Sequence, residues 1–272
     1  MADQAAALRQ LLRDEDPATV ALIKHELVTA GSASRPVLRQ LLGDPDISVA
    51  SHVRDVLAEI DSSDARLRFE QLCPRMRSLA ELEEATWLLA QVFLPGLETP
   101  PYVQILDDWG RALKEQLASA PNANGRVQSL VRFFTQELKL RGNTQNYYDL
   151  RNLLLPCVID SRLGIPTTLS LIYIFVGERA GETVHGINLP GHFLIRFEDH
   201  LLDPFLQGRE LAKRDYLEIL AQPEEELGMD GLAANPRTML LQVLNNLWHI
   251  LEDEEDSQQR GLVFGWLQSM RS

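Results

Sequence analysis

One apolar segment followed directly by three short ones constrains the fold of this chain most. The run TTLSLIYIFVGERAG predicts a buried helix that begins at Pro166 and ends at Gly181, because proline suits the first turn of a helix and glycine its end. The segments ETVHGINL, HFLIRF and HLLDPF then predict three short strands, separated by turns at Pro190-Gly191 and Glu198-Asp199. This order of elements predicts a helix packed on a small antiparallel sheet.

The N-terminal region contains a repeat that appears when the sequence is shifted by thirty residues, which aligns LLRDEDPATVALIKHEL with LLGDPDISVASHVRDVL. In each copy an Asp-rich turn, with Pro17 or Pro45, separates an apolar pair from a segment with apolar residues at helical spacing. The repeat predicts two stacked helical hairpins over residues 1–61, similar to a short HEAT-type solenoid. Two interpretations stay open: a cap that covers the next domain, and a surface that docks a partner.

The rest of the chain is dominated by helical patterns. Longer amphipathic segments follow from about Ser62, then the polar loop RGNTQNYYDLRN, then the buried helix and strands. The tail from Asn235 predicts two amphipathic helices joined by an acidic turn in LEDEEDSQQ. We therefore divide the chain into a repeat region (1–61), a central domain (62–234) and a C-terminal hairpin (235–272), and expect an α+β protein that is mostly helical.

Charge and cysteine content exclude several classes of function. The net charge is −13, with 26 Lys and Arg against 39 Asp and Glu, which argues against a nucleic-acid partner and against an anionic membrane surface. Neither a leader sequence nor an apolar run of membrane-spanning length is present in these 272 residues, so we expect a cytoplasmic protein. Cys73 and Cys157 have no metal-type spacing and fit a reducing compartment. The sequence predicts neither a metal nor an organic cofactor.

One pair of residues points to chemistry. His192 begins a predicted strand and Asp203 ends the next one, so in an antiparallel hairpin the two can lie on neighbouring strands. The Asp203 carboxylate can then orient the imidazole of His192 for general-base work. The alternative is a satisfied core pair that holds two strands together.

Three blocks of sequence resemble a known family. They are RLGIPTTLSLIYIFVGERAG, HGINLPGHFLIRF and LLDPFLQGREL, and they are similar to the SirB-type branch of the transglutaminase-like superfamily over about residues 79–251. The resemblance implies a papain-like core with helices on a small antiparallel sheet, and a C-terminal hairpin similar to a truncated tetratricopeptide unit. It also implies that a cysteine at a helix N-terminus attacks an amide carbonyl while His192 and Asp203 activate it.

The sequence departs from that family at the nucleophile. The family's cysteine position, at the start of the helix, is occupied by Pro166, which cannot attack a carbonyl. Thr167 and Thr168 follow it, and Thr168 is the candidate for a hydroxyl nucleophile, with helix capping as its alternative role. Cys157 lies nine positions earlier in the apolar run LLLPCVI, where we expect a small buried hydrophobe.

The remaining candidates are polar residues near the predicted cleft. Pro166 and Thr167 form its helix side, while Asn152, Asn188 and Arg162 are candidates for its lining. For Arg162 we favour pairing with a carboxylate or with backbone carbonyls over contact with a ligand.

These residues lead to two functional readings. The favoured one is a transglutaminase-like protein that lacks the catalytic cysteine. It binds a protein or peptide in the cleft that corresponds to the active site of active family members. The alternative is an amidase, peptidase or acyltransferase in which His192 and Asp203 act with a hydroxyl nucleophile or an activated water.

Overall fold

The computed structural model describes residues 2–189, 191–212, 233–252 and 257–271. Pro190 of the predicted turn and the centre of the acidic turn, 253–256, lie outside the described residues. The chain forms two compact units: Met1–Phe69 with Leu88–Glu98, and Glu70–Trp87 with Thr99–Ser272. The C-terminal hairpin therefore shares one unit with the central region.

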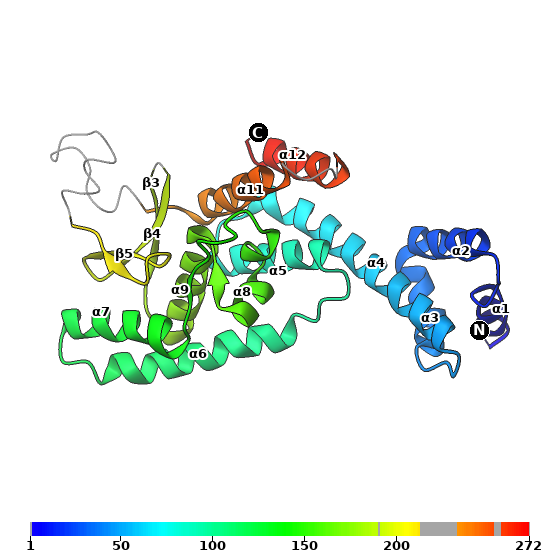
Figure 1. Cartoon of the computed structure of the whole chain (residues 1–272), viewed down its shortest axis with the longest axis horizontal. Coiled ribbons are helices and arrows are strands. Elements are labelled where there is room, and N and C mark those ends of the chain that lie inside the picture. The colour runs from blue at the N-terminus through cyan, green and yellow to red at the C-terminus, as the bar shows by residue number, and fades with distance from the viewer. Residues whose placement is uncertain (1, 190, 213–232, 253–256, 272) are drawn as a thin grey trace. The chain divides into compact units, whose positions relative to one another are not determined.

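The first unit contains two successive pairs of helices, each joined by an Asp-rich turn, and also includes residues 88–98 (Figure 1). Their two Asp-rich turns use the same hydrogen bonds. The amide of Asp16 donates to Asp14 Oδ1 at 2.9 Å, and the amide of Asp46 donates to Asp44 Oδ1 at 2.9 Å. The two copies of the sequence repeat therefore form turns with the same local hydrogen bond. The helical elements are α1 (Ala2–Leu11), α2 (Pro17–Ala30), η1 (Gly31–Ser34), α3 (Arg35–Leu41) and α4 (Ile47–Leu72).

The second unit is built around one buried helix, α9 (Pro166–Ala180), whose predicted ends are confirmed. Pro166 occupies its first turn, and Gly181 ends it with φ +82°. Helices α6 (Pro100–Ala118) and α8 (Leu155–Ser161) contact it directly. The other helical elements before α9 in this unit are η2 (Cys73–Arg75), the first part of α5 (Leu79–Phe93), α7 (Ala123–Arg132), the π-helical turn η3 (Phe133–Glu137) and η4 (Leu150–Asn152).

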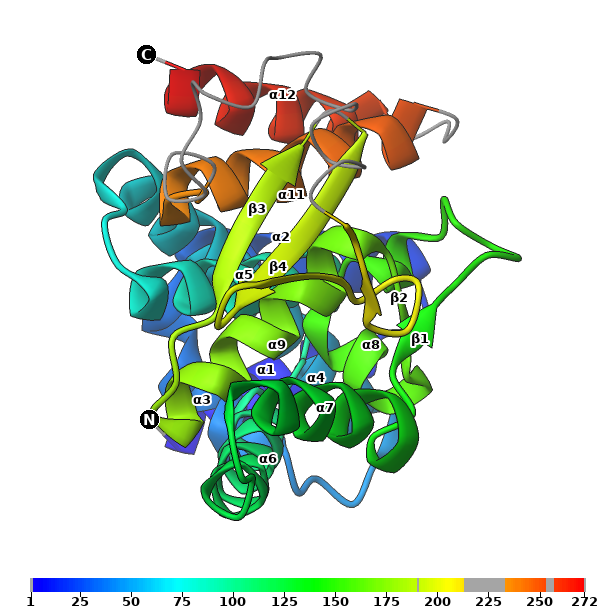
Figure 2. The same cartoon turned by 90° about the vertical axis from the view of Figure 1, so that its left-hand side faces the viewer.

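The predicted strands form an antiparallel sheet that packs on α9. Its order is β3-β4-β5-β6, and Figure 2 shows β3 and β4 lying across α9. A second, two-stranded sheet pairs β1 with β2 in parallel. The fold class, α+β and mostly helical, is confirmed. The strands are β1 (Arg141–Gly142), β2 (Leu163–Gly164), β3 (His185–Leu189), β4 (His192–Phe197), β5 (His200–Asp203) and β6 (Arg209–Glu210).

The C-terminal hairpin, α11 (Pro236–Glu252) and α12 (Ser257–Arg271), belongs to this packing. Helix α11 contacts α9 and buries Leu240, Leu244 and Leu247 completely. Just before it, the amide of Ala234 donates to the carbonyl of Gly186 in β3 at 2.8 Å. Within the described residues, no helix combines the length and apolar character that crossing a membrane requires.

Candidate functional site

A pocket of about 490 Å³ lies in the second unit where β4 begins, beside the N-terminus of α9 and along α11. Its wall combines aromatic rings, backbone at a helix start and a polar face of α11, a mixture typical of binding sites. It is lined by Tyr147, Tyr148, Ile165, Pro166, Thr167, Gly191, His192, Phe193, Gln242, Asn246, His249, Ile250 and Glu252.

His192 is the exposed first residue of β4 and lines this pocket. It pairs with Leu189 across the β3–β4 hairpin, next to Gly191, which has φ +75°. A positive φ is accessible to glycine at no steric cost, so Gly191 suits the position just before the strand that carries the imidazole.

Asp203 is not among the lining residues and is only 6% exposed. Its Oδ1 accepts the amides of Phe205 at 2.9 Å and Leu206 at 3.1 Å. Burial raises the pKa of the Asp203 carboxyl above its usual value, while those two amides and the charges of His192 and Arg209 act in the opposite direction. The carboxyl is therefore held by the turn that follows β5.

The strand register explains how His192 and Asp203 are placed. Ile195 pairs with Leu202, which sets Asp203 across from Leu194, so His192 and Asp203 share one face of the sheet but are diagonal neighbours. Within the described part of the chain, no hydrogen bond joins the two side chains. The residues are close enough to interact electrostatically, without forming a hydrogen-bonded dyad.

Tyr173 of α9 adds a group that the sequence did not reveal. Its ring stacks on Phe134 with centroids 3.7 Å apart, and its buried hydroxyl has no hydrogen-bond partner among the described residues. Burial, and then the charge of Asp203, raises the pKa of this hydroxyl above its ordinary value. The signal in the sequence was a single tyrosine within the apolar run LIYIFV, a pattern that is equally typical of a core residue.

The start of α9 places its two threonines differently. Thr167 lines the pocket, and its Oγ1 accepts a hydrogen bond from Asn246 Nδ2 of α11 at 2.8 Å. Thr168 is 1% exposed, lies outside the lining and donates to the carbonyl of Leu153 at 3.5 Å. Because successive helical residues point about 100° apart, only one of these hydroxyls faces the pocket.

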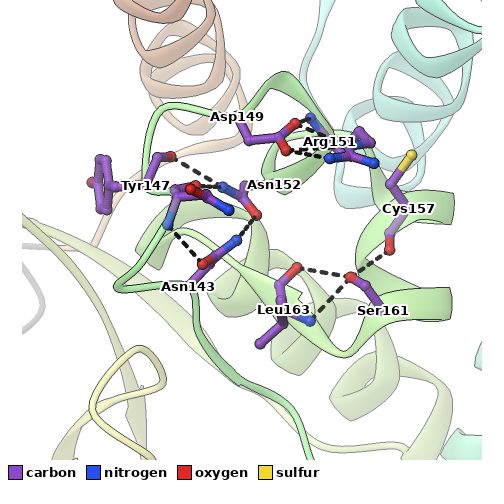
Figure 3. A network of polar contacts seen from close by, with 9 residues as sticks. Asn143, Tyr147, Asp149, Arg151, Asn152, Cys157, Ser161 and Leu163 are labelled. Atoms are coloured by element: carbon purple, nitrogen blue, oxygen red, sulfur yellow. Dashed lines mark hydrogen bonds and ion pairs between the residues drawn. The ribbon is translucent and has the colours of Figure 1, made fainter.

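Asn152 organises the loop that carries the two tyrosines (Figure 3). It is 3% exposed, and its Nδ2 donates to the carbonyls of Asn146 at 2.6 Å and Tyr147 at 3.1 Å. Its Oδ1 accepts from Asn143 Nδ2 at 3.0 Å. Asn152 therefore shapes the pocket from behind, whereas Tyr147 and Tyr148 reach its surface.

Two other candidates lie away from the pocket lining. Arg162 ends α8 with φ +64°, and its guanidinium lies 4.7 Å above the ring of Trp109. Asn188 is exposed on β3, paired with Phe193. Among the residues that the structure describes, no group of three His, Cys, Asp or Glu side chains is placed to hold a metal ion.

The two cysteines are not activated. Burial raises the pKa of the Cys73 thiol to about 12 and raises that of the half-buried Cys157 thiol as well. Thiolate nucleophiles need the opposite shift.

The polar residues of α11 are the part of the site that sequence reasoning missed. Gln242, Asn246, His249 and Glu252 all line the pocket, whereas the sequence predicts only an amphipathic hairpin over 235–272 and no site on it. Their spacing is helical, as on any solvated helix face, so the sequence carried no signal for a pocket there.

Comparison with known proteins adds the relatives of this chain. Residues 101–246 match the family model described as the transglutaminase-like superfamily. A UPF0162 protein of Xylella fastidiosa (strain 9a5c) is 30% identical over 194 residues, which cover 65% of this chain and 69% of that protein. A UPF0162 protein of Pseudomonas aeruginosa is 31% identical over 181 residues, with 64% of this chain and 66% of that protein covered.

A more distant kind of relative is eukaryotic. Mouse F-box only protein 21 is 31% identical over 139 residues, which cover 47% of this chain and 22% of that protein. No solved structure matches the chain.

Proposed function

The chain belongs to the transglutaminase-like superfamily, and from this premise we propose that it is a non-catalytic protein- or peptide-binding module that uses the pocket beside His192. The observation that carries the proposal is the pocket itself, in which His192 and two tyrosines surround the start of α9. Tyrosine supplies contact area at low entropic cost together with a polar tip, which suits recognition of peptides.

The composition of the helix start supports binding over catalysis. Pro166 stands where the family resemblance places a cysteine, and the hydroxyl of Thr167 is already engaged by Asn246. The hydroxyl of Thr168 donates to the carbonyl of Leu153, and Thr168 is not among the residues that line the pocket with His192. Nucleophilic catalysis needs a nucleophile within hydrogen-bonding reach of its base, and these contacts use both threonines for packing.

The second candidate is an amidase, peptidase or acyltransferase in which His192 activates a water. One observation favours it: the imidazole is exposed to the pocket and interacts electrostatically with the Asp203 carboxyl. In this candidate Asp203 stabilises the protonated imidazole.

The flanking regions complete the proposal. We assign the first unit to a HEAT-like pair of hairpins and the α11–α12 hairpin to a tetratricopeptide-like unit of the SirB type. The matching hydrogen bonds of the two Asp-rich turns support the first assignment. Two free cysteines support a cytoplasmic location.

The test selects peptides from a random library on the full chain and then measures their affinity by fluorescence anisotropy. His192→Ala and Tyr148→Ala each remove an exposed lining side chain and should weaken binding about tenfold. Asn188→Ala, on β3 but outside the lining, is the matched control and should bind like the wild type. Affinity that neither lining variant changes rules out this pocket as the binding site.

The same samples decide between binding and catalysis. Wild-type chain and His192→Ala are incubated with a library of peptide amides and esters, and products are read by mass spectrometry. We expect no turnover from either. Turnover by the wild type that disappears in His192→Ala replaces the binding module with the hydrolytic or transfer activity.

A further inference from the structure

A second cavity lies next to the His192 pocket. It has a volume of about 660 Å³ and is lined by Arg141, Gly142, Asn143, Thr144, Gln145, Leu163, Phe205, Leu206, Gln207 and Arg209. We call it the arginine groove. An aromatic contact separates the two cavities: Tyr147 lines the His192 pocket, Phe205 lines the groove, and their ring centroids are 5.8 Å apart at an interplanar angle of 72°.

The groove has an unusual charge for this protein. Its lining contains two exposed arginines and no acidic residue, in a chain whose net charge is −13. Within the described residues, neither Arg141 nor Arg209 forms an ion pair with a carboxylate. Arginines elsewhere do so: Arg179, for example, lies 2.7 Å from both Glu83 and Asp107. The groove is therefore a positive site on an acidic protein.

The acidic groups beside Arg209 have contacts of their own. Asp203 is cross-strand to Arg209 and interacts with its charge, but the carboxyl is buried, and its Oδ1 accepts two backbone amides. The carboxylate of Glu210 is bound to His200 Nδ1 at 2.8 Å. Because both guanidinium groups are exposed and lack an ion pair among the described residues, they can bind a ligand, and guanidinium groups bind carboxylates with two parallel hydrogen bonds.

The walls of the groove are strand edges held by tight turns. Strand β6, which carries Arg209, is the last strand of its sheet, and β1, which carries Arg141, pairs only with β2 among the described residues. The turn before Arg209 uses positive φ at Gln207 and Gly208, closed by the Gly208 amide on the Asp203 carbonyl at 2.8 Å. Strand edges offer backbone hydrogen bonds to an extended peptide.

The floor of the groove is closely packed as well. A Cβ added at Gly142 would lie 2.5 Å from the ring of Phe205, so backbone and ring are in direct contact there. The backbone beside each arginine is therefore held in place, at Arg141 by the Gly142–Phe205 contact and at Arg209 by the turn before it.

We propose that the arginine groove binds an acidic polypeptide segment, with Arg141 and Arg209 holding its carboxylate side chains and the edges of β1 and β6 offering backbone hydrogen bonds. The site is distinct from the His192 pocket and does not rest on the function proposed for it. The aromatic contact between Tyr147 and Phe205 makes the two sites neighbours, so one extended partner has room to occupy both.

The test measures the affinity of a fluorescent glutamate-rich peptide for the full chain. The double variant Arg141→Gln with Arg209→Gln should bind it at least about tenfold more weakly, because charged hydrogen bonds are lost. The same peptide with glutamine in place of glutamate should bind the wild type with a similar loss. Arg111→Gln, a change of one charge at a side chain that is 69% exposed and outside the groove, should bind normally.

A charge-reversal variant distinguishes the loss of a specific charge interaction from misfolding caused by the substitutions. The variant Arg141→Glu with Arg209→Glu should lose the acidic peptide and gain affinity for a lysine-rich one, while keeping the circular dichroism spectrum of the wild type. His192→Ala should still bind the acidic peptide, which separates this site from the His192 pocket. Equal affinity for the glutamate and glutamine peptides overturns the proposal. Displacement of the peptide by micromolar inorganic phosphate also overturns it, since the groove would then be a site for a free anion.

Discussion

At the scale of single residues, Asp203 is a buried carboxyl group that the protein controls through its surroundings. Burial raises its pKa, so between the ordinary value and the raised one the folded chain binds a proton that the unfolded chain has released. Its contribution to stability therefore decreases as the pH rises through that range. This direction is opposite to that of a carboxylate in a salt bridge.

Replacement of Asp203 by asparagine tests this assignment. The amide Oδ1 can still accept the hydrogen bonds from Phe205 and Leu206, but it carries no charge to desolvate. We expect the free energy of unfolding at neutral pH to stay equal or rise by up to about 1 kcal/mol, with a weaker dependence on pH above about 4. Urea denaturation of both proteins across this pH range measures it. A variant that is clearly less stable at neutral pH would mean that the ionised carboxylate is itself stabilising.

Asn152 is a second residue whose hydrogen bonds can be tested by substitution, because its amide nitrogen and amide oxygen have different partners. Asn152→Asp replaces a donor that serves two carbonyls with an acceptor of nearly the same shape. It should cost about 3 kcal/mol of unfolding free energy, more than the roughly 2 kcal/mol of Asn152→Ala, because a buried charge would face two carbonyl oxygens.

Thermal and urea denaturation of both Asn152 variants check this order. Asn188→Asp introduces the same chemical change at an exposed position and should cost little. If Asn152→Asp were as stable as the wild type, the amide donors would not hold the loop that carries Tyr147 and Tyr148.

At the scale of elements, the contact between α6 and α9 depends on a glycine. A Cβ added at Gly110 would lie 2.3 Å from the Cβ of Arg179 and 3.3 Å from its backbone carbon, so the two helices approach closely here. Arg179 then reaches past this contact to both Glu83 and Asp107. The small residue and the ion pairs are parts of one packing arrangement.

Gly110→Ala should therefore destabilise the protein by about 2 kcal/mol or more, since overpacked helices must move apart. Gly261→Ala is the matched control, because it also lies in a helix but its added Cβ meets no atom within 4 Å. That change should stabilise by about 0.5–1 kcal/mol through helix propensity alone. Chemical denaturation of the two variants distinguishes them, and the same sign for both would contradict the packing argument.

The elements also show what the sequence predicts and where it fails. Helix α9 and strands β3, β4 and β5 carry local signals, namely a long apolar run between Pro166 and Gly181 and three short runs after it. Strands β1, β2 and β6 have two residues each and exist because distant backbone is in reach, which no local pattern encodes.

The candidate site follows the same rule. Pro166, Thr167 and His192 line one pocket because the start of a helix and the start of a strand meet there. Asn152, Arg162 and Asn188 lie behind or outside it, and their positions depend on side-chain partners such as Trp109 and Asn143. The contribution of α11 depends on how a helix more than 40 residues downstream packs on α9, which is a property of tertiary structure.

At the scale of the whole molecule, the C-terminal hairpin is part of the second unit. Helix α11 buries Leu240, Leu244 and Leu247 at 0% exposure and ties Asn246 to Thr167 at the start of α9. Its removal would expose the apolar surface that packs against these leucines. The hairpin therefore contributes both to stability and to the wall of the His192 pocket.

A chain ending at residue 234 should for this reason lose cooperative thermal unfolding, followed by circular dichroism, and should bind a dye specific for exposed apolar surface. A separate peptide of residues 235–272 should restore the transition, whereas the same peptide with Leu244→Ser and Leu247→Ser should not, because the polar hydroxyls would be buried without partners. If the shortened chain unfolds cooperatively at the full-length midpoint, the hairpin is an independent appendage. In that case α9 would fold without α11. The His192 pocket would then lie between two parts of the chain that fold separately.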